Sequence, residues 1–597
     1  MLNRILVGVL VLGTGGIAAT LAGQDAATSS LPEWTRGACW YRIIVTRFHN
    51  GDSTNDPQDT QRWPSVRQVR YFDPSPPGMY ELRNEHYGGD LQGLRARLPY
   101  LKQLGIDVLY LSPIFVAPSE HNYDPADLRH VDDMLAVANS LGKIKNESDD
   151  PSSWQFSQSD QLFLEFVKEA HTQGFRVVLE NVFSQAGVMT WARRDILRKK
   201  RRSPCADWFR MKSWDPRPEW DTDNGYGNKL IPLRLEGDGF SPGAEAHLHA
   251  VTKRWMDPNG DGDPSDGIDG WAVFDAPRMP RATLQRWRQV IRRINPDAVL
   301  IGDFVGVFPM KATFAVPPAA DEFDLTIDYS LSDSLGRFFH IERVGTDSEG
   351  LIDSLMTVHS AQAESDRRGT ISAVSAPSLG RLLNKIAHDE PSMDTTAAEA
   401  GAYDNWRLAM AVHFLGSSNP MLYYGDEAGM DAHGGSSARQ PMKWDDLPGG
   451  VAKSSDPNAS FAGMIRQLNN IRRRFAPLSR GDFRRVPFDE ERPILVFARS
   501  LPGDKVIVII NGGKGREEVA LSIGWPGRMV GIVNPELSPG PLHPLLQKKQ
   551  IAAGGDKKSA LRLFGSRQFA DEWGDITVTV SPQSIRLVIV KDEEPRG

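Results

Sequence analysis

Short apolar runs recur along most of the chain, and the segments between them carry apolar residues at helical spacing. The runs are rich in Val, Ile and Leu without strict polar alternation, which is typical of strands buried on both faces of a parallel sheet. They span residues 39–48, 105–113, 174–183, 267–275, 298–304, 323–329, 381–389 and 419–427. Eight strands that alternate with helices predict an α/β protein built on a (β/α)8 TIM barrel, whose chemistry lies at the carboxyl ends of the strands.

Two further regions depart from this pattern. Residues 184–266, between the third and fourth runs, are too many for a simple connection and are rich in aromatic and basic side chains, so we predict a small inserted domain there. After about residue 480, strand-like runs such as VIVIINGG and SIRLVIVK follow at short intervals. This change predicts a C-terminal all-β domain over 481–597, behind a barrel region over 24–480.

The N-terminus has the layout of an export signal. Arg4 precedes an uncharged apolar run over residues 5–23. This run is also close to the length that spans a bilayer, so cleavage and retention as an anchor both stay open. Either outcome predicts an exported protein, periplasmic or extracellular, whose contact with a membrane is limited to this segment.

Charge and cysteine content narrow the function classes. The 69 basic and 76 acidic residues give a net charge of −7, which argues against a nucleic-acid partner. Cys39 and Cys205 are the only cysteines, and either a disulfide or two separate thiols fits them.

A basic run, RRDILRKKRR, occupies residues 193–202. We interpret it as the solvated face of a helix, with contact to an anionic surface as the alternative. The sequence does not indicate an oligomeric state.

Seven motifs follow one another in a familiar order. They are YRIIVTRFHNGDSTND, YGGDLQGL, LYLSPIFVAPSEHNYDPADL, DGIDGW, INPDAVLIGD, AHDE and MLYYGDEAGM. From about residue 39 to 480 the chain thereby resembles the α-amylase superfamily, glycoside hydrolase family 13, and in particular its neopullulanase and cyclomaltodextrinase-like members. The resemblance implies a barrel that binds an α-glucan or maltooligosaccharide.

The resemblance also exposes substitutions at the catalytic positions. Where the family reads GWRLDVANEVP, this chain reads GWAVFDAPRMP, so Phe274 stands in the place of the nucleophile and Ala272 in that of an arginine. The family's acid, the Glu of a GE pair, is Asp303 here. Retaining glycosidases need two carboxyls about 5–5.5 Å apart, and phenylalanine cannot form the glycosyl-enzyme bond. We therefore expect weak or no hydrolysis and a glucan-binding role.

Asp275 offers an alternative nucleophile. Neighbouring strand residues point to opposite faces, so Asp275 should face the helices and pair there with a basic residue. A one-residue bulge would instead turn it into the mouth and give an active α-1,4-glucan hydrolase or transglycosylase with Asp303 as the acid. A third option is different barrel chemistry that uses Asp303, Asp389 and Glu180.

The resemblance implies further binding residues. His388 and Asp389 match a pair that grips sugar hydroxyls, Tyr123 matches an aromatic that stacks on the sugar, and Gln185 replaces a sugar-binding histidine. A calcium pattern of the family is matched by Asn50, Asp52, Asn55, Asp56, Gly88 and Asp90. Oxygen-rich ligands suit Ca²⁺, although ordinary polar turns use the same residues. The loop at 257–267 opens like an EF-hand but has Ile268 at its twelfth position, so calcium and a plain turn both stay open there.

Overall fold

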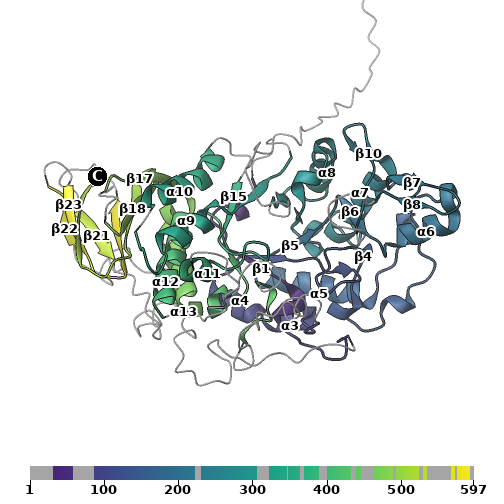
Figure 1. The fold of residues 1–597 in the computed structure, drawn as a ribbon, viewed down its shortest axis with the longest axis horizontal. Helices are drawn as coiled ribbons and strands as arrows, with labels where there is room; N and C mark the ends of the chain where they lie inside the picture. Colours follow the sequence, from purple (N-terminus) through teal and green to yellow (C-terminus); the bar gives the residue numbers. More distant parts are fainter. Residues whose placement is uncertain are drawn as a thin grey trace, which may run out of the picture.

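The computed structural model describes most of the chain between the leader and the C-terminus. The described residues are 31–57, 86–221, 230–304, 322–345, 347–363, 369–388, 400–431, 438–444, 461–488, 492–523, 529–533, 567–571 and 575–591. The leader at 1–23 and Asp389 lie outside them. The molecule is elongated, with the C-terminal strands at one end, the barrel in the middle and the inserted segment at the other end (Figure 1).

Eight parallel strands close into a barrel, which confirms the predicted fold class. In chain order they are β1 (Trp40–Ile43), β2 (Val108–Leu111), β5 (Arg176–Asn181), β12 (Gly270–Val273), β13 (Val299–Gly302), β14 (Leu325–Asp328), β15 (Gly369–Ala373) and β16 (Pro420–Tyr423). Each strand pairs with its sequence neighbours, and β1 pairs with both β2 and β16 to close the ring.

One predicted strand is wrong. Residues 381–389 do not form the seventh barrel strand, because Leu382–Ala387 forms helix α11. Leu382, Leu383 and Ile386 are buried at helical spacing, while β15 supplies the seventh strand. Strand β15 has the sequence GTISA, which is short and consists mostly of small residues. Its apolar pattern is therefore weaker than that of the helix that follows it.

Side chains alternate between the inside of the barrel and the layer of helices. Val178 of β5, Ala272 of β12 and Ile301 of β13 belong to the inner cluster. Leu179 and Trp271, one position away in their strands, pack in the outer cluster with the helices. This alternation fixes which residues can reach the mouth at the carboxyl ends of the strands.

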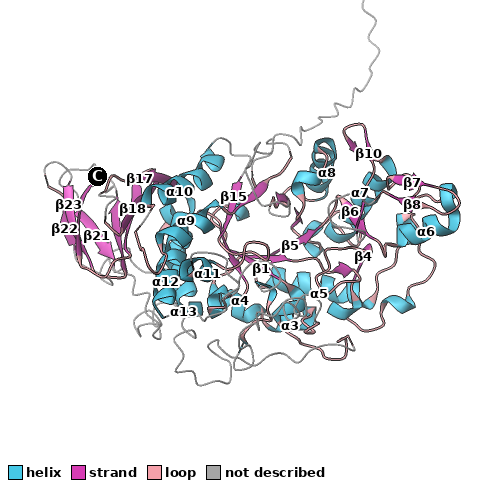
Figure 2. Cartoon of the chain, in the orientation of Figure 1, coloured by secondary structure: helices cyan, strands magenta, loops and turns pink. Residues whose placement is uncertain are grey.

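Helices surround the barrel on its outer face (Figure 2). They include α3 (Leu91–Ala96), α4 (Leu98–Leu104), α5 (Gln158–Thr172), α7 (Pro242–Met256), α8 (Arg281–Ile294), α9 (Ser330–Phe338), α10 (Ser348–Ala363), α12 (Ala400–Gly416) and α13 (Phe461–Arg474). Helix α5 begins with a capping box, in which the Ser157 hydroxyl accepts from the Asp160 backbone N–H and the Asp160 carboxylate accepts from the Ser157 backbone N–H. Such caps satisfy the free N–H groups at the helix start.

The described residues of the inserted segment form short two-stranded sheets and two α-helices, α6 and α7. Its strands are β6 (Gln185–Gly187) with β9 (Leu230–Pro232), β7 (Met211–Ser213) with β8 (Glu219–Trp220), and β10 (Leu235–Glu236) with β11 (Gly239–Phe240). Helix α6 (Trp191–Lys199) follows β6. This segment lies between β5 and β12, at the carboxyl end of the third barrel strand.

The C-terminal region is antiparallel. A six-stranded sheet contains β17 (Asp482–Arg485), β18 (Ile494–Leu501), β19 (Asp504–Asn511), β24 (Ser584–Lys591), β21 (Met529–Val533) and β22 (Arg567–Phe569), and a second sheet pairs β20 (Glu517–Ser522) with β23 (Asp575–Val580). Apolar side chains of both sheets form one core.

Two further observations concern the chain as described. Cys39 and Cys205 are both buried, and each is a free cysteine. Among the described residues, no helix is long and apolar enough to cross a membrane.

Candidate active site

An arginine occupies the centre of the barrel mouth. Arg42, at an inward position of β1, is 1% exposed. Its Nη2 pairs with Oε1 of Glu180 on β5, and its Nη1 lies 3.1 Å from Oδ2 of Asp303, the residue after β13. Three distant segments therefore meet at one guanidinium, and both carboxylates are fully buried.

Tyrosines complete this cluster. The Tyr329 hydroxyl, just after β14, accepts a hydrogen bond of 3.0 Å from Arg42 Nη1 and donates one of 3.0 Å to Asp303 Oδ2. The ring of Tyr110 on β2 lies 5.1 Å from the guanidinium carbon. Asp303, expected to be the acid, is thus held by a cation and a hydroxyl in the floor of the mouth.

Glu180 has a strongly perturbed acidity. Burial and the nearby Asp303 raise its pKa, the Arg42 guanidinium lowers it, and the net result is a pKa of about 7. Perturbed carboxyls are found at functional sites and also in structural ion-pair networks. Here the hydrogen bonds of Glu180 come from protein groups, so the geometry fits a structural network.

An aromatic pair forms the accessible surface above this cluster. Phe274 is partly exposed, and its ring centroid lies 4.6 Å from that of Tyr123. The Tyr123 hydroxyl donates a 3.1 Å hydrogen bond to Glu180 Oε2. Tyr123 thereby links the mouth to the buried charges, and Phe274 presents an aromatic ring at the position where the sequence resemblance implies a nucleophile.

Asp275 points away from the mouth. Strand β12 keeps an unbroken register with β5 from Gly270 to Val273, so it contains no bulge. Asp275 is 1% exposed, its Oδ2 accepts from the Ser184 hydroxyl, and burial raises its pKa. The neighbouring Phe183 packs on Trp287 of α8. The Ser184 hydroxyl is the side chain that hydrogen-bonds Asp275, and the positive charge of Arg278 lowers the pKa of this carboxyl.

The remaining expected sugar contacts are dispersed. His388 ends helix α11 and does not end a barrel strand. Gln185 begins β6 and lines a cavity of about 60 Å³ beneath the inserted segment, together with Trp191, Trp208 and His247. Burial lowers the pKa of His247 to about 4, so this imidazole is neutral near pH 7. Of these expected contacts, Tyr123 and Phe274 are the two that touch each other.

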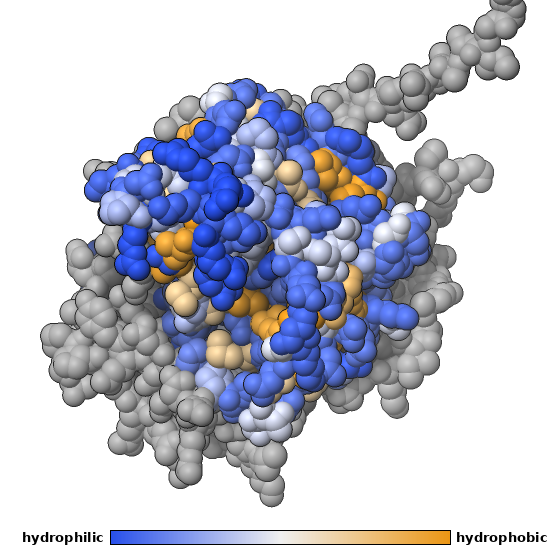
Figure 3. Space-filling model, turned by 90° about the vertical axis from the view of Figure 1, so that its right-hand side faces the viewer, coloured by the Kyte–Doolittle hydropathy of each residue, from blue (hydrophilic) through white to orange (hydrophobic). Residues whose placement is uncertain are grey.

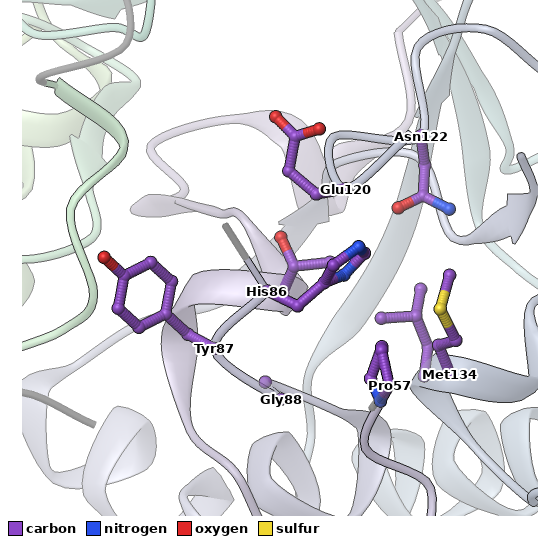
Figure 4. Close-up of a pocket in the computed structure, with 10 residues that line it drawn as sticks. Pro57, His86, Tyr87, Gly88, Glu120, Asn122 and Met134 are labelled. Carbon is purple, nitrogen blue, oxygen red and sulfur yellow. The ribbon is translucent and has the colours of Figure 1, made fainter. Parts of the chain in front are cut away.

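The expected calcium residues lie in adjoining loops. Asn50 Nδ2 donates to both Asp56 oxygens, at 2.9 and 3.0 Å. A Cβ at Gly88 would lie 2.2 Å from Asn50 Nδ2 and 2.2 Å from Asp56 Oδ1, and Gly88 has φ +71°. Gly88 lies beneath a pocket that Tyr87, His86, Glu120 and Asn122 also line (Figure 4). Only glycine fits this close approach.

The oxygens of this loop fit a cation in part. Asn55 Oδ1 is buried without a hydrogen-bond partner, as expected for an atom that awaits a ligand. Asp90, in contrast, caps helix α3, and its oxygens accept from the backbone N–H groups of Gly51, Asp52 and Gly93. The described residues contain no cluster of three His, Cys, Asp or Glu side chains suited to a metal.

The loop at 257–267 is arranged as a series of turns. Asn259 Oδ1 accepts from the Asp261 N–H at 2.8 Å, and Asp261 Oδ1 accepts from the Asp263 N–H at 2.7 Å. Asp263 Oδ1 in turn accepts from the Ser265 N–H at 3.0 Å. These side chains bond to their own backbone two residues on, as in Asx-turns.

Sequence reasoning missed the roles of Arg42 and Tyr329. One signal was present, since Arg42 is a charged residue inside the apolar run CWYRIIV. Arg42 lies two residues after Trp40, which belongs to the inner cluster. Strand residues two apart face the same side, so this spacing would have placed Arg42 inside the barrel. Its partners could not be inferred because they come from other strands.

The comparisons agree with this architecture. A family model described as "Alpha amylase, catalytic domain" matches residues 42–147. Neopullulanase 2 of Thermoactinomyces vulgaris is 28% identical over 505 residues, which cover 83% of this chain and 73% of that protein. A cyclomaltodextrinase of Geobacillus thermopakistaniensis is 27% identical over 503 residues, 83% of this chain and 72% of the relative.

Solved structures share the fold. A cyclomaltodextrinase superposes with a TM-score of 0.66 at 21% identity, covering 94% of this chain and 80% of that one. The cyclic α-maltosyl-(1→6)-maltose hydrolase of Arthrobacter globiformis gives a TM-score of 0.62 at 20% identity, with 92% and 100% covered. In its barrel, its ordered motifs and these matches, the chain is similar to the α-amylase family, glycoside hydrolase family 13, and in particular to members of the neopullulanase and cyclomaltodextrinase type.

Proposed function

We propose that this protein binds α-glucan chains in the mouth of its barrel. The support is the aromatic pair of Tyr123 and Phe274, whose ring centroids are 4.6 Å apart at the carboxyl end of the barrel. The flat apolar face of a sugar ring packs well on such rings. The relatives named as neopullulanase and cyclomaltodextrinase support maltooligosaccharides as the ligand class.

We propose further that the bound α-glucan is hydrolysed slowly or not at all. The observation that carries it is the Phe274 side chain, which supplies no oxygen at the end of β12 where a nucleophile would stand. Asp303 is fully buried and held by Arg42 and Tyr329, and Asp275 is turned toward Ser184. The two accessible carboxyls that a retaining mechanism needs are therefore not brought together among these residues.

Hydrolysis or transglycosylation is the second candidate, and the comparisons favour it. Two relatives that match more than four-fifths of this chain are named after glucan-cleaving activities. For this chain, the activity would require Asp275 to leave Ser184 and approach Asp303. Such a rearrangement would have to separate two buried groups that contact one another in the structure.

One preparation tests both candidates. Binding of maltoheptaose is measured by calorimetry, and release of reducing sugar is followed with maltooligosaccharides, cyclodextrin and pullulan. We expect binding without release above the uncatalysed rate. Release that disappears in Asp303→Ala would overturn the proposal and support the hydrolase. If Tyr123→Ala binds as well as the unmodified protein does, the mouth is not the glucan site.

Two further properties belong to this proposal. Calcium would be held beside Gly88 by oxygens of Asn55 and Asp56, and it would stabilise the loop that carries them. Export is supported by the apolar run after Arg4, which lies outside the described residues. The first property is tested by the change in Tm when EDTA removes calcium, and the second by the N-terminal sequence of the secreted protein.

A further inference from the structure

Helix α6 carries a dense array of basic side chains at the surface of the inserted segment. Residues 193–202 contain seven basic residues and one acidic residue, in a chain whose net charge is −7. Asp195 pairs with Lys199 at 2.9 Å, and Asp215 pairs with Lys200 at 3.0 Å. The local charge therefore stays strongly positive after these ion pairs are counted.

Three arginines of this array are available to a partner. In the described part of the chain, the exposed side chains of Arg194 and Arg202 have no hydrogen-bond or ion-pair partner. Arg198 has a 77% exposed side chain and lies 4.0 Å from Asp195. Arg194 and Arg202, which are unpaired, and the highly exposed Arg198 can therefore meet external negative charge.

Exposed apolar side chains occur within α6 and just before it. Met189 is 54% exposed just before the helix, and Leu197 is 41% exposed within it. Helical spacing puts Arg194, Leu197 and Arg198 on one side of α6, since residues three and four apart are neighbours. We call Met189, Arg194, Leu197, Arg198 and Arg202 the α6 face.

The whole end of the molecule shares this character. Of the four large hydrophobic side chains that are strongly exposed in the described residues, three belong to the inserted segment: Met189, Leu197 and Leu235. The space-filling view of this end shows hydrophobic patches bordered by strongly hydrophilic side chains (Figure 3). Scattered apolar side chains are ordinary on a surface, but here they coincide with unpaired cations.

We propose that the α6 face docks the protein on an anionic phospholipid bilayer. Guanidinium groups meet lipid phosphates, and Leu197 and Met189 enter the boundary between headgroups and acyl chains. An acidic protein partner is less suited, because single protruding side chains offer no groove or packed apolar centre for an interface. A bilayer needs no such shape complementarity.

Co-sedimentation of the full-length protein with vesicles tests this docking. Vesicles of phosphatidylcholine with phosphatidylglycerol are compared with phosphatidylcholine alone. We expect binding to the mixed vesicles only, and its loss in about 1 M salt, where the screening length falls to about 3 Å. The triple variant R194Q/R198Q/R202Q should bind about a hundredfold more weakly, since each cation near an anionic surface contributes about a fivefold factor.

A matched variant controls for net charge and for the leader. K168Q/K253Q/R484Q removes the same charge from exposed positions on other faces and should bind as the unmodified protein does. Both variants keep the same N-terminus, so any insertion of that segment cancels in the comparison. Leu197→Ser should weaken binding severalfold without changing its dependence on salt.

Three results would overturn the docking. The first is equal vesicle binding by the two triple variants, and the second is equal binding to both kinds of vesicle. The third is capture by polyglutamate but not by vesicles, which would assign the α6 face to an acidic protein. Circular dichroism of each variant confirms that it is folded before its binding is compared.

Discussion

The Arg42 guanidinium joins Glu180 and Asp303 across the barrel mouth, with Nη1 3.1 Å from Asp303 Oδ2 and Nη2 paired to Glu180 Oε1. One cation thus neutralises part of two buried negative charges. Ala272 pairs with Glu180 in the sheet register and adds only a small side chain to the same barrel interior. Several measurable consequences follow from this arrangement and from the loops around it.

Removal of the bridging cation should destabilise the protein severely. Arg42→Met leaves two buried carboxyls without a cation, and we expect a loss of about 3–5 kcal/mol in the free energy of unfolding at pH 8. The loss should shrink at pH 5, because a protonated Glu180 needs no counter-charge. Urea unfolding at both pH values measures it. Arg36→Met, whose side chain is 43% exposed, should cost no more than about 1 kcal/mol.

Glu427 should make stability fall as pH rises. Burial raises the pKa of this carboxyl from 4.5 to about 7, although it accepts hydrogen bonds from the hydroxyls of Tyr41 and Tyr100. Because the folded pKa lies above the unfolded one, this stabilising contribution is complete below about pH 4.5 and is lost toward pH 7. The loss amounts to about 3 kcal/mol.

Glu427→Gln should remove this part of the pH dependence. Denaturant unfolding of both proteins between pH 4.5 and 7.5 measures the difference in slope. Glu349→Gln, at an exposed position, should leave the slope as it is. Parallel curves for the unmodified protein and Glu427→Gln would contradict the assigned titration.

Calcium should stabilise the loop beside Gly88. Addition of EDTA should lower the Tm, and calcium at a hundred times its Kd should restore about 2.7 kcal/mol. Gly88→Ala should abolish the response, because its Cβ would lie 2.2 Å from Asp56 Oδ1. Gly237→Ala is the control, since it also has a positive φ, +63°, but open space around it. A calcium response that survives Gly88→Ala would place the ion elsewhere.

Carboxyls installed at the family positions should create hydrolysis. The double variant Phe274→Asp and Asp303→Glu should release reducing sugar about a hundredfold faster than the unmodified protein, because the nucleophile and a longer acid are both supplied. Asp303→Ala in place of Asp303→Glu is the matched control and should show no gain. No gain in a folded double variant would mean that the mouth does not bind glucan productively.

Aromatic stacking should account for part of the glucan affinity. Tyr123→Ala should weaken maltoheptaose binding about tenfold, in line with the value of an aromatic contact. Tyr123→Phe keeps the ring and loses the hydrogen bond to Glu180 Oε2, so it should bind nearly as well as the unmodified protein. Calorimetry distinguishes the two. Equal losses in both variants would assign the effect to the hydroxyl.

Alternation along the strands was the most reliable guide to the site. The resemblance placed Phe274 in the mouth, and two-residue periodicity turned Asp275 toward the helices. Asp275 is buried against Ser184, and β12 keeps an unbroken register up to Val273. The barrel itself followed from the spacing of apolar runs. Periodicity failed at residues 381–389, where the apolar residues of α11 resembled a strand while the true strand, β15, was small and weakly apolar.

Contacts between distant strands could not be predicted in this way. The meeting of Arg42 with Glu180 and Asp303 depends on the closure of the barrel, which places β13 across from β1, and β5 on the far side of β2. The local sequence pattern does not indicate which cationic side chain contacts which carboxylate. The hydroxyl contact of Ser184 with Asp275 was missed for the same reason, because the two residues lie 91 positions apart.

The placement of an arginine on β1 and of an alanine on β12 also limits which side chains the mouth accepts. An arginine at position 272 would bury a second guanidinium near the first, next to Glu180. Like charges so confined repel strongly. Position 272 should therefore accept a cationic side chain only in a protein that has lost the cation at position 42.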